Sequence, residues 1–300
     1  KGLATGVVAS AGTLGSLIPP SILFLLYGVI AEVSVVKLMI AGILPGLLTA
    51  GIYTVMISVR CYLNPELAPR LGATESNISK SEKRRALMDV WPLLLLISGI
   101  IGGLYGGIVT PTEAGAGGAF LACVITTLQR RMSLKVLRNS LVEAVSASAR
   151  IFFVAVGAIM YSKFLSLTGM PTFVGDLMGD WKLDPIMLVI GASIIYVILG
   201  MFLDPIGVLL LTLPVLLPMF EALNLDLIWL GVLVVKYLEI GLLTPPVGLN
   251  VYVIKSVVGE KIPLETIFRG VGWFLVCELI IVVLLVAFPQ ISLFLPNTMN

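Results

Sequence analysis

Two Pro-Pro pairs, each inside a long apolar stretch and each preceded by a glycine, constrain the fold of this chain most. The first pair is Pro19-Pro20, after Gly15, and the second is Pro245-Pro246, after Gly241. Proline lacks a backbone N–H and clashes with the preceding turn, so a Pro pair breaks a helix. In lipid, broken backbone is tolerated only where protein covers it or where it lines a wet cavity. We therefore expect both breaks to line a buried polar site.

The composition places the chain in a membrane. Of its 300 residues, 58% are hydrophobic and 12% are charged, whereas a soluble domain carries roughly 25% charged residues. We predict an all-α polytopic membrane protein. The chain has no histidine, which excludes histidine-based catalysis, metal ligation and proton relays. Its basic residues lie in loops between apolar segments, so we expect no nucleic-acid partner.

Apolar runs and helix breakers predict the positions of the spans. The expected spans are about residues 3–30 (broken), 36–59, 91–109, 112–128, 151–167 and 271–288, with a broken span at about 227–258. A hydrophilic segment covers residues 60–90, and a basic amphipathic stretch covers 129–150. Thr110-Pro111-Thr112-Glu113 has the pattern of a capping box that starts a helix. Residues 170–183 are predicted to form a polar connection.

The segment at about 184–223 has the pattern of a re-entrant hairpin. Two apolar arms flank the break Gly200-Met201-Phe202-Leu203-Asp204-Pro205, and the second arm is short. The alternative is two ordinary spans joined by a short turn at the far surface. The charge distribution does not separate the two interpretations.

The distribution of basic residues orients the spans. With the 60–90 loop in the cytoplasm, 15 of the 19 Lys and Arg residues fall on the inside, as the positive-inside rule requires. The C-terminus then lies in the periplasm. In this topology the first broken span runs from inside to outside and the second from outside to inside.

Similar sequence in opposite orientation predicts an inverted repeat. We divide the chain into the C-terminal part of a first repeat (1–59), a cytoplasmic basic linker (60–90) and a second repeat (91–300). The second repeat would hold three scaffold spans, the hairpin, the broken helix and a final span. If the repeat units are whole, roughly 130 residues of the first unit are missing before Lys1.

The breaks expose groups suited to ions. Half-helix N-termini attract a carboxylate, and freed carbonyl groups attract sodium. Asp204 at the hairpin tip is a candidate, although it is equally suited to be the N-cap of the returning helix. Lys236 and Glu239 either neutralise each other or act in transport. The predicted substrate- and ion-binding residues are Gly15, Ser16, Pro19, Pro20, Ser21, Asp204, Glu239, Gly241, Thr244, Pro245, Pro246, Gly248 and Asn250, with sodium near Gly15, Ser16, Thr244 and Gly248.

Four stretches carry a resemblance to a known family. They are Ala11-Gly-Thr-Leu-Gly-Ser-Leu-Ile-Pro-Pro-Ser21, Gly106-Gly-Ile-Val-Thr-Pro-Thr-Glu-Ala114, Gly200-Met-Phe-Leu-Asp-Pro205 and Leu238-Glu-Ile-Gly-Leu-Leu-Thr-Pro-Pro-Val-Gly-Leu-Asn250. The chain resembles the large membrane subunit (DctM type) of tripartite ATP-independent periplasmic (TRAP) transporters, lacking its N-terminal part. The resemblance implies a sodium-coupled, elevator-type importer of organic acids in the bacterial inner membrane. It implies a periplasmic binding protein and a small four-helix membrane subunit as partners, and sodium ions but no organic cofactor.

One departure from the family matters. The family's first hairpin, with its Gly-Ser-Ser tip, is absent from this sequence, so half of the first sodium site has no residues here, and the chain alone is not expected to transport. The alternatives are a stand-alone sodium/dicarboxylate symporter and a non-functional truncated fragment. An intramembrane enzyme is disfavoured, because the sequence has no histidine, no facing Asp pair and no Gly-x-Ser-x-Gly motif.

Overall fold

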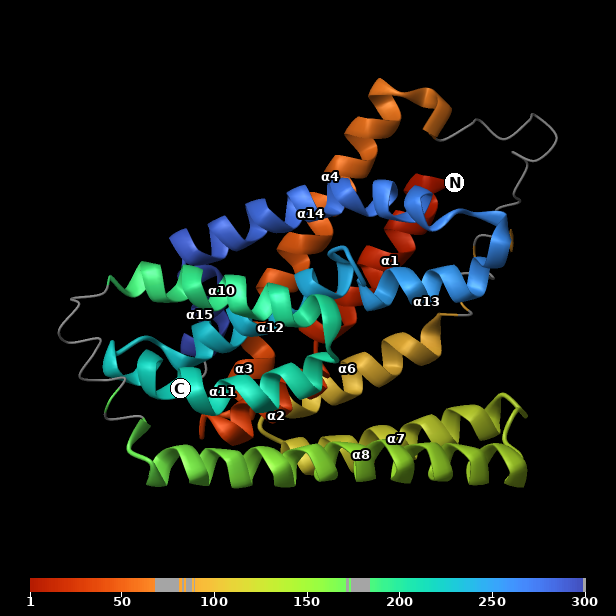
Figure 1. Ribbon diagram of the computed structural model, residues 1–300. Coiled ribbons are helices and arrows are strands. Elements are labelled where there is room, and N and C mark those ends of the chain that lie inside the picture. Colours follow the sequence, from red (N-terminus) through yellow and green to blue (C-terminus); the bar gives the residue numbers. More distant parts are fainter. Residues whose placement is uncertain are drawn as a thin grey trace. The chain divides into compact units, whose positions relative to one another are not determined.

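The computed structural model describes residues 1–67, 81, 82, 84, 88, 90–170, 173 and 184–298, and all regular structure in these residues is helical. The helices are α1 (Gly2–Leu17), α2 (Ile22–Ile30), α3 (Val35–Ala41), α4 (Ile43–Leu63), α6 (Trp91–Tyr105), α7 (Pro111–Leu128), α8 (Leu134–Leu167), α10 (Pro185–Phe202), α11 (Pro205–Ala222), α12 (Leu227–Leu243), α13 (Leu249–Val258), α14 (Leu264–Ala287) and α15 (Gln290–Asn297), with short 3-10 turns η1 (Pro65–Leu67) and η2 (Gly259–Lys261) (Figure 1). The predicted all-α fold class is confirmed. The polar connection, with Asp176, Asp180 and Lys182, and most of the 60–90 linker lie outside the described residues.

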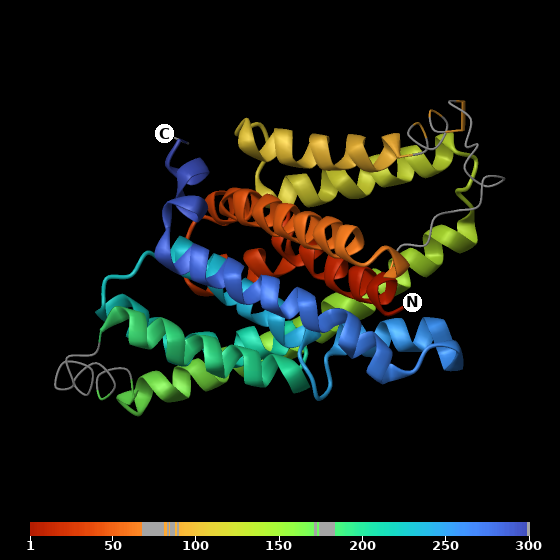
Figure 2. The same ribbon diagram turned by 90° about the horizontal axis from the view of Figure 1, so that it is seen from above.

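The chain forms two compact units. The first comprises Lys1–Thr54 and Ala147–Asn300, and the second comprises Val55–Ser146. In the second unit α6 and α7 pack side by side (Figure 2). The predicted capping box starts α7: Thr110 accepts a hydrogen bond from the Glu113 amide, and the Glu113 carboxylate accepts one from the Thr110 amide at 2.8 Å.

Helix α12 forms the centre of the first unit. Every residue from Trp229 to Glu239 is buried, and α12 packs against α1, α10 and α14 among other helices. The outer helices instead expose apolar side chains, such as Phe153 of α8 and Ile194 of α10. The helix that carries charged residues is thus buried, while the apolar helices around it are exposed. This arrangement is expected when lipid covers the outside of the protein.

Helices α1 and α14 cross with their backbones in contact. A Cβ atom on Gly6 would lie 2.6 Å from the carbonyl carbon of Gly270, and one on Gly270 would lie 2.0 Å from the carbonyl oxygen of Gly2. Helices in membranes approach this closely only through small residues. The glycines therefore fix the first broken helix against the last long span.

The chain breaks where the proline pairs predict. Helix α1 ends at Leu17 and α2 begins at Ile22, while α12 ends at Leu243 and α13 begins at Leu249. Both Pro-Pro peptide bonds are cis. The predicted hairpin is also helix–turn–helix, with only Leu203 and Asp204 between α10 and α11. Its position relative to a membrane surface stays a prediction.

Two predicted spans differ in detail from the structure. The span predicted at 36–59 is present as the helical segment Val35–Leu63, but a turn at Gly42 divides it into α3 and α4, because Pro45 gives the Ala41 carbonyl no amide. Conversely, the basic stretch and the span predicted at 129–150 and 151–167 join as the single 34-residue helix α8. No proline or glycine stands at Arg150 to end a helix there.

Length and composition agree with membrane insertion. Within the described part of the chain, six helical segments are long and apolar enough to cross a bilayer: Gly2–Ile30, Val35–Leu63, Leu134–Leu167, Pro185–Phe202, Pro205–Ala222 and Leu264–Ala287. The chain is an integral membrane protein.

Candidate functional site

The first loop, between α1 and α2, is held by a serine. Ser21 is the N-cap of α2: its hydroxyl oxygen accepts a hydrogen bond from the Phe24 amide at 3.4 Å, and its O–H donates to the carbonyl of Ser16. Pro19 is buried and Pro20 is exposed. A single side chain therefore fixes both the start of α2 and the last turn of α1.

The second loop, between α12 and α13, begins with hydrogen bonds to a carbonyl group of the last turn of α12. The Thr244 hydroxyl donates to the Ile240 carbonyl at 2.6 Å, and the Thr244 amide donates to the same carbonyl at 3.0 Å. Gly248 has a φ of 58° and starts α13, and a Cβ there would lie 3.2 Å from the carbonyl oxygens of Leu243 and Thr244. Glycine is required at this position for both reasons. Pro245 and Pro246 are exposed.

Asn250 connects the two broken helices. It lies in the first turn of α13, and its side-chain amide donates to the Ala9 carbonyl of α1 at 3.3 Å. Helix α1 packs against both α12 and α13. Residues about 240 positions apart in the sequence thus meet where the start of α13 contacts the middle of α1.

The glycines that precede the two Pro-Pro pairs differ in their surroundings. Gly241 is buried against α10, where a Cβ would lie 2.7 Å from the Cα of Gly200. Gly15 is exposed, and no described atom lies within 4 Å of a Cβ built there. In this structure Gly241 permits a helix crossing.

Glu239 belongs to a buried polar cluster. The Lys236 ammonium lies 3.0 Å from Glu239 Oε2, 2.9 Å from Glu278 Oε1 and 3.2 Å from Thr49 Oγ1. The Tyr53 hydroxyl donates to Glu278 Oε1. Sequence reasoning paired Lys236 with Glu239 but missed the contributions of α4 and α14. A lone glutamate in an apolar span, such as Glu278, was the available signal, because a buried carboxylate needs a partner.

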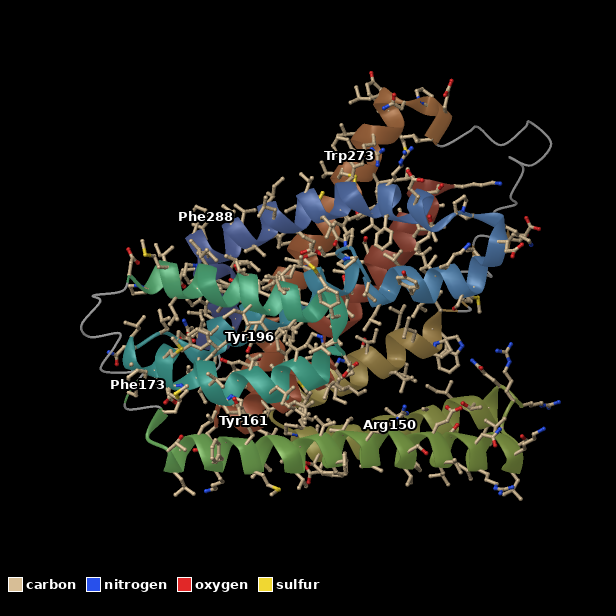
Figure 3. All side chains as sticks on the ribbon, in the orientation of Figure 1. Arg150, Tyr161, Phe173, Tyr196, Trp273 and Phe288 are labelled. Carbon is tan, nitrogen blue, oxygen red and sulfur yellow. The ribbon has the colours of Figure 1, made fainter. Side chains whose placement is uncertain are left out.

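Asp204 is the N-cap of α11, as one of the two sequence interpretations predicted. Its carboxylate accepts from the Ile206 amide at 3.1 Å and from the Gly207 amide at 3.3 Å. Asp204 also lines a pocket of about 360 Å³ with Arg150 of α8 and the apolar side chains of Ile151 and Val154. Arg150, labelled on α8 in Figure 3, is a residue that sequence reasoning placed in a loop.

The polar groups at the loops can be compared with the ligands that metal ions prefer. No group of three His, Cys, Asp or Glu side chains that could hold a metal occurs within the described ranges. The loops instead bring together backbone carbonyls and hydroxyls, which are oxygen ligands. Helix ends at the same places supply partial charges of both signs.

A family model describing the DctM component of tripartite ATP-independent periplasmic transporters matches residues 1–291. The chain belongs to this family. The match confirms the predicted resemblance to the large TRAP permease. The loops at the two Pro-Pro pairs are therefore part of a TRAP large permease.

Named relatives agree with the family. The chain is 36% identical to the C4-dicarboxylate TRAP transporter large permease protein DctM of Pseudomonas aeruginosa, over 97% of this chain and 67% of that protein. It is 32% identical to the sialic acid TRAP transporter large permease protein SiaM of Vibrio cholerae, over 98% of this chain and 67% of that protein. It is 33% identical to the ectoine/5-hydroxyectoine TRAP transporter large permease protein UehC of Ruegeria pomeroyi, over 96% and 66% respectively. The chain thus spans about two thirds of these TRAP permeases.

Proposed function

We propose that this chain is part of the large transmembrane subunit of a sodium-coupled secondary transporter that imports organic acids by an elevator mechanism. The observation that carries the proposal is the pair of proline-broken helices, linked by the hydrogen bond from Asn250 to Ala9. Paired discontinuous helices from two inverted repeats form the substrate and ion sites of many secondary transporters. The repeat relation between residues 1–59 and 91–300 belongs to the same proposal.

Sodium would bind at the two loops. In the second loop, the carbonyl oxygens of Leu243 and Thr244 lie beside Gly248, where a side chain would exclude an ion. The Thr244 hydroxyl donates a hydrogen bond to the Ile240 carbonyl oxygen, so the lone pairs of the hydroxyl oxygen face away from that bond and are available to a cation. In the first loop, Gly15 and Ser16 would contribute.

The substrate would be a carboxylate, such as a C4-dicarboxylate, sialic acid or a similar organic acid. The N-terminal ends of α2 and α13 direct positive helix dipoles toward the loops, and Arg150 adds a cationic group in the pocket with Asp204. The names of the Pseudomonas and Vibrio relatives support this class. The ectoine relative shows that the family's substrates vary.

The partners would be a periplasmic binding protein that delivers the substrate and a small four-helix membrane subunit. The family description, a component of a tripartite periplasmic transporter, supports both. A relative named as the isethionate TRAP transporter permease DctMQ suggests that the small subunit is sometimes fused to the large one. We place the complex in the bacterial inner membrane, with the 60–90 loop in the cytoplasm and the C-terminus in the periplasm.

Uptake into proteoliposomes tests the proposal. The transporter that contains this chain would be reconstituted with its small subunit and supplied with labelled carboxylates, with and without a sodium gradient and the binding protein. We expect uptake only when sodium and the binding protein are both present. Sodium-dependent uptake without the binding protein would instead support a stand-alone symporter, and uptake driven equally by potassium would contradict sodium coupling.

A further inference from the structure

A cluster of five polar side chains crosses the centre of the first unit. Lys236 and Glu239 come from α12, Glu278 from α14, and Thr49 and Tyr53 from α4. The two glutamates and the lysine have no exposed surface, and Tyr53 is 4% exposed. These groups are sealed from solvent, so their charges must balance among themselves.

The charges do not balance if both carboxyl groups are ionised. Lys236 supplies one positive charge, and all three of its N–H donors have acceptors: Thr49, Glu239 and Glu278. Two carboxylates would leave one uncompensated negative charge inside a membrane protein. Such a charge is strongly unfavourable, and a buried acid in this situation takes up a proton instead.

The surrounding helices offer no second buried cation among the described residues. Cys277 of α14 and Tyr53 of α4 lie close enough to interact with the glutamates. Beyond them, the elements packed on α12 bury Tyr27 of α2 and Tyr196 of α10. Figure 3 labels Tyr196. All of these groups are neutral when protonated. The basic side chains on the packed helices are engaged elsewhere or exposed: Lys37 is exposed, Lys255 donates to the Gly259 and Ile262 carbonyls, and Arg269 pairs with Glu265 at 2.7 Å. On α4, the half-buried Arg60 lies seven residues after Tyr53, in the last turn of the helix.

The contacts distinguish the two glutamates. Both oxygens of Glu278 lie within 2.9 Å of the Lys236 ammonium, and Oε1 also accepts from Tyr53. Glu278 Oε2 makes no hydrogen bond in the described part of the chain, but it lies 2.8 Å from the ammonium, so Glu278 keeps two hydrogen-bond donors and a close cation at its second oxygen. Glu239 receives one donor, on Oε2, while its Oε1 is buried with no hydrogen-bond partner among the described residues. An ionised carboxylate is stable where several donors reach it, and an oxygen without donors is better accommodated as O–H.

We propose that this cluster is an intramembrane proton-binding site, with one proton on Glu239 Oε1 in the conformation described here. A proton from water bonds to the carboxylate, Glu239 becomes a neutral carboxylic acid, and Lys236 with Glu278 forms a neutral ion pair. The site is separate from the loop oxygens proposed for sodium. Its test therefore does not depend on transport.

Infrared difference spectroscopy of the purified full-length protein in lipid at neutral pH tests the proposal. Only protonated carboxyl groups show the carbonyl stretch of a carboxylic acid, so surface acids are silent. We expect one such band, absent in Glu239→Gln. Lys236→Met should add a second band, because both carboxyl groups must then be neutral. The matched control, Glu265→Gln, changes a paired but exposed glutamate and should leave the band unchanged.

Three outcomes would overturn the proposal. They are a wild-type spectrum without the band, a band that persists in Glu239→Gln, and a band whose frequency shifts in Tyr53→Phe, which would assign the proton to Glu278. Thermal melting provides a second measurement. Glutamine has the shape of a protonated glutamate, so Glu239→Gln should melt at the wild-type temperature, and a clear drop would mean that Glu239 is ionised.

Discussion

Gly200 of α10 and Gly241 of α12 meet backbone to backbone. A Cβ on Gly241 would lie 2.7 Å from both the Cα and the carbonyl carbon of Gly200. Two helices cross at this separation only where neither carries a side chain. The crossing lies three residues before the second loop and holds α12 against the first arm of the hairpin.

We predict that Gly241→Ala destabilises the packing of α10 on α12. The added methyl group must displace backbone, which costs about 1–3 kcal/mol for overpacking. A lower melting temperature of the purified protein would show this. Gly191→Ala is the matched control, since Gly191 is also on α10 and no described atom lies within 4 Å of a Cβ there. Equal melting temperatures for the two variants would contradict the prediction.

Asp204 can be tested against a second cap of the same kind. Asp204→Ala removes the acceptor for two amides and should cost about 0.5–2 kcal/mol of stability. We also expect it to impair sodium-dependent uptake. Asp184 precedes Pro185 and caps α10 through the Ile186 amide in the same way, so Asp184→Ala controls for the loss of a cap.

Asp204→Ser separates the cap from the charge. Serine also accepts an N-cap hydrogen bond, so this variant should regain stability but not uptake. Wild-type uptake with unchanged sodium dependence in either Asp204 variant would leave Asp204 as a helix cap only.

Thr244→Val should raise the sodium concentration needed for half-maximal uptake. Valine has nearly the same shape but no oxygen, and the loss of one ligand at about 0.5–1.5 kcal/mol corresponds to a shift of roughly two- to tenfold. Thr126 of α7 makes the same bond to the carbonyl four residues before it, at 2.7 Å, and Thr126→Val should not change the sodium curve. An unaltered curve for Thr244→Val would exclude its hydroxyl as a ligand.

Ser21→Ala should weaken the first loop. It removes the bond to the Ser16 carbonyl and the cap of α2, so we expect faster proteolysis or hydrogen exchange in residues 16–24 and a higher sodium requirement for uptake. Ser34 caps α3 through the Lys37 amide, and Ser34→Ala should lower stability alone. If both variants behave alike in uptake, Ser21 has only a capping role.

Local chemistry allowed the sequence to predict much of the fold. Proline cannot donate in a helix, so the breaks after Leu17 and Leu243 follow from residue type alone. The Thr110–Glu113 capping box and the Asp204 cap also depend on neighbours within three residues. The turn at Gly42 also has a local cause, the missing amide of Pro45, whereas the close approach of Leu17 and Phe24 to Gly42 depends on α1 and α2.

The sequence by itself therefore determined a helical membrane protein, its breaks and its caps, because these depend on composition and on contacts within one turn. The tertiary structure alone decided that Gly241 packs on Gly200 while Gly15 is exposed, although both precede a Pro-Pro pair. It also decided that Lys236 faces two glutamates, since Glu278 is 42 residues away along the chain. Such contacts depend on which faces of distant helices meet, and local sequence does not specify that.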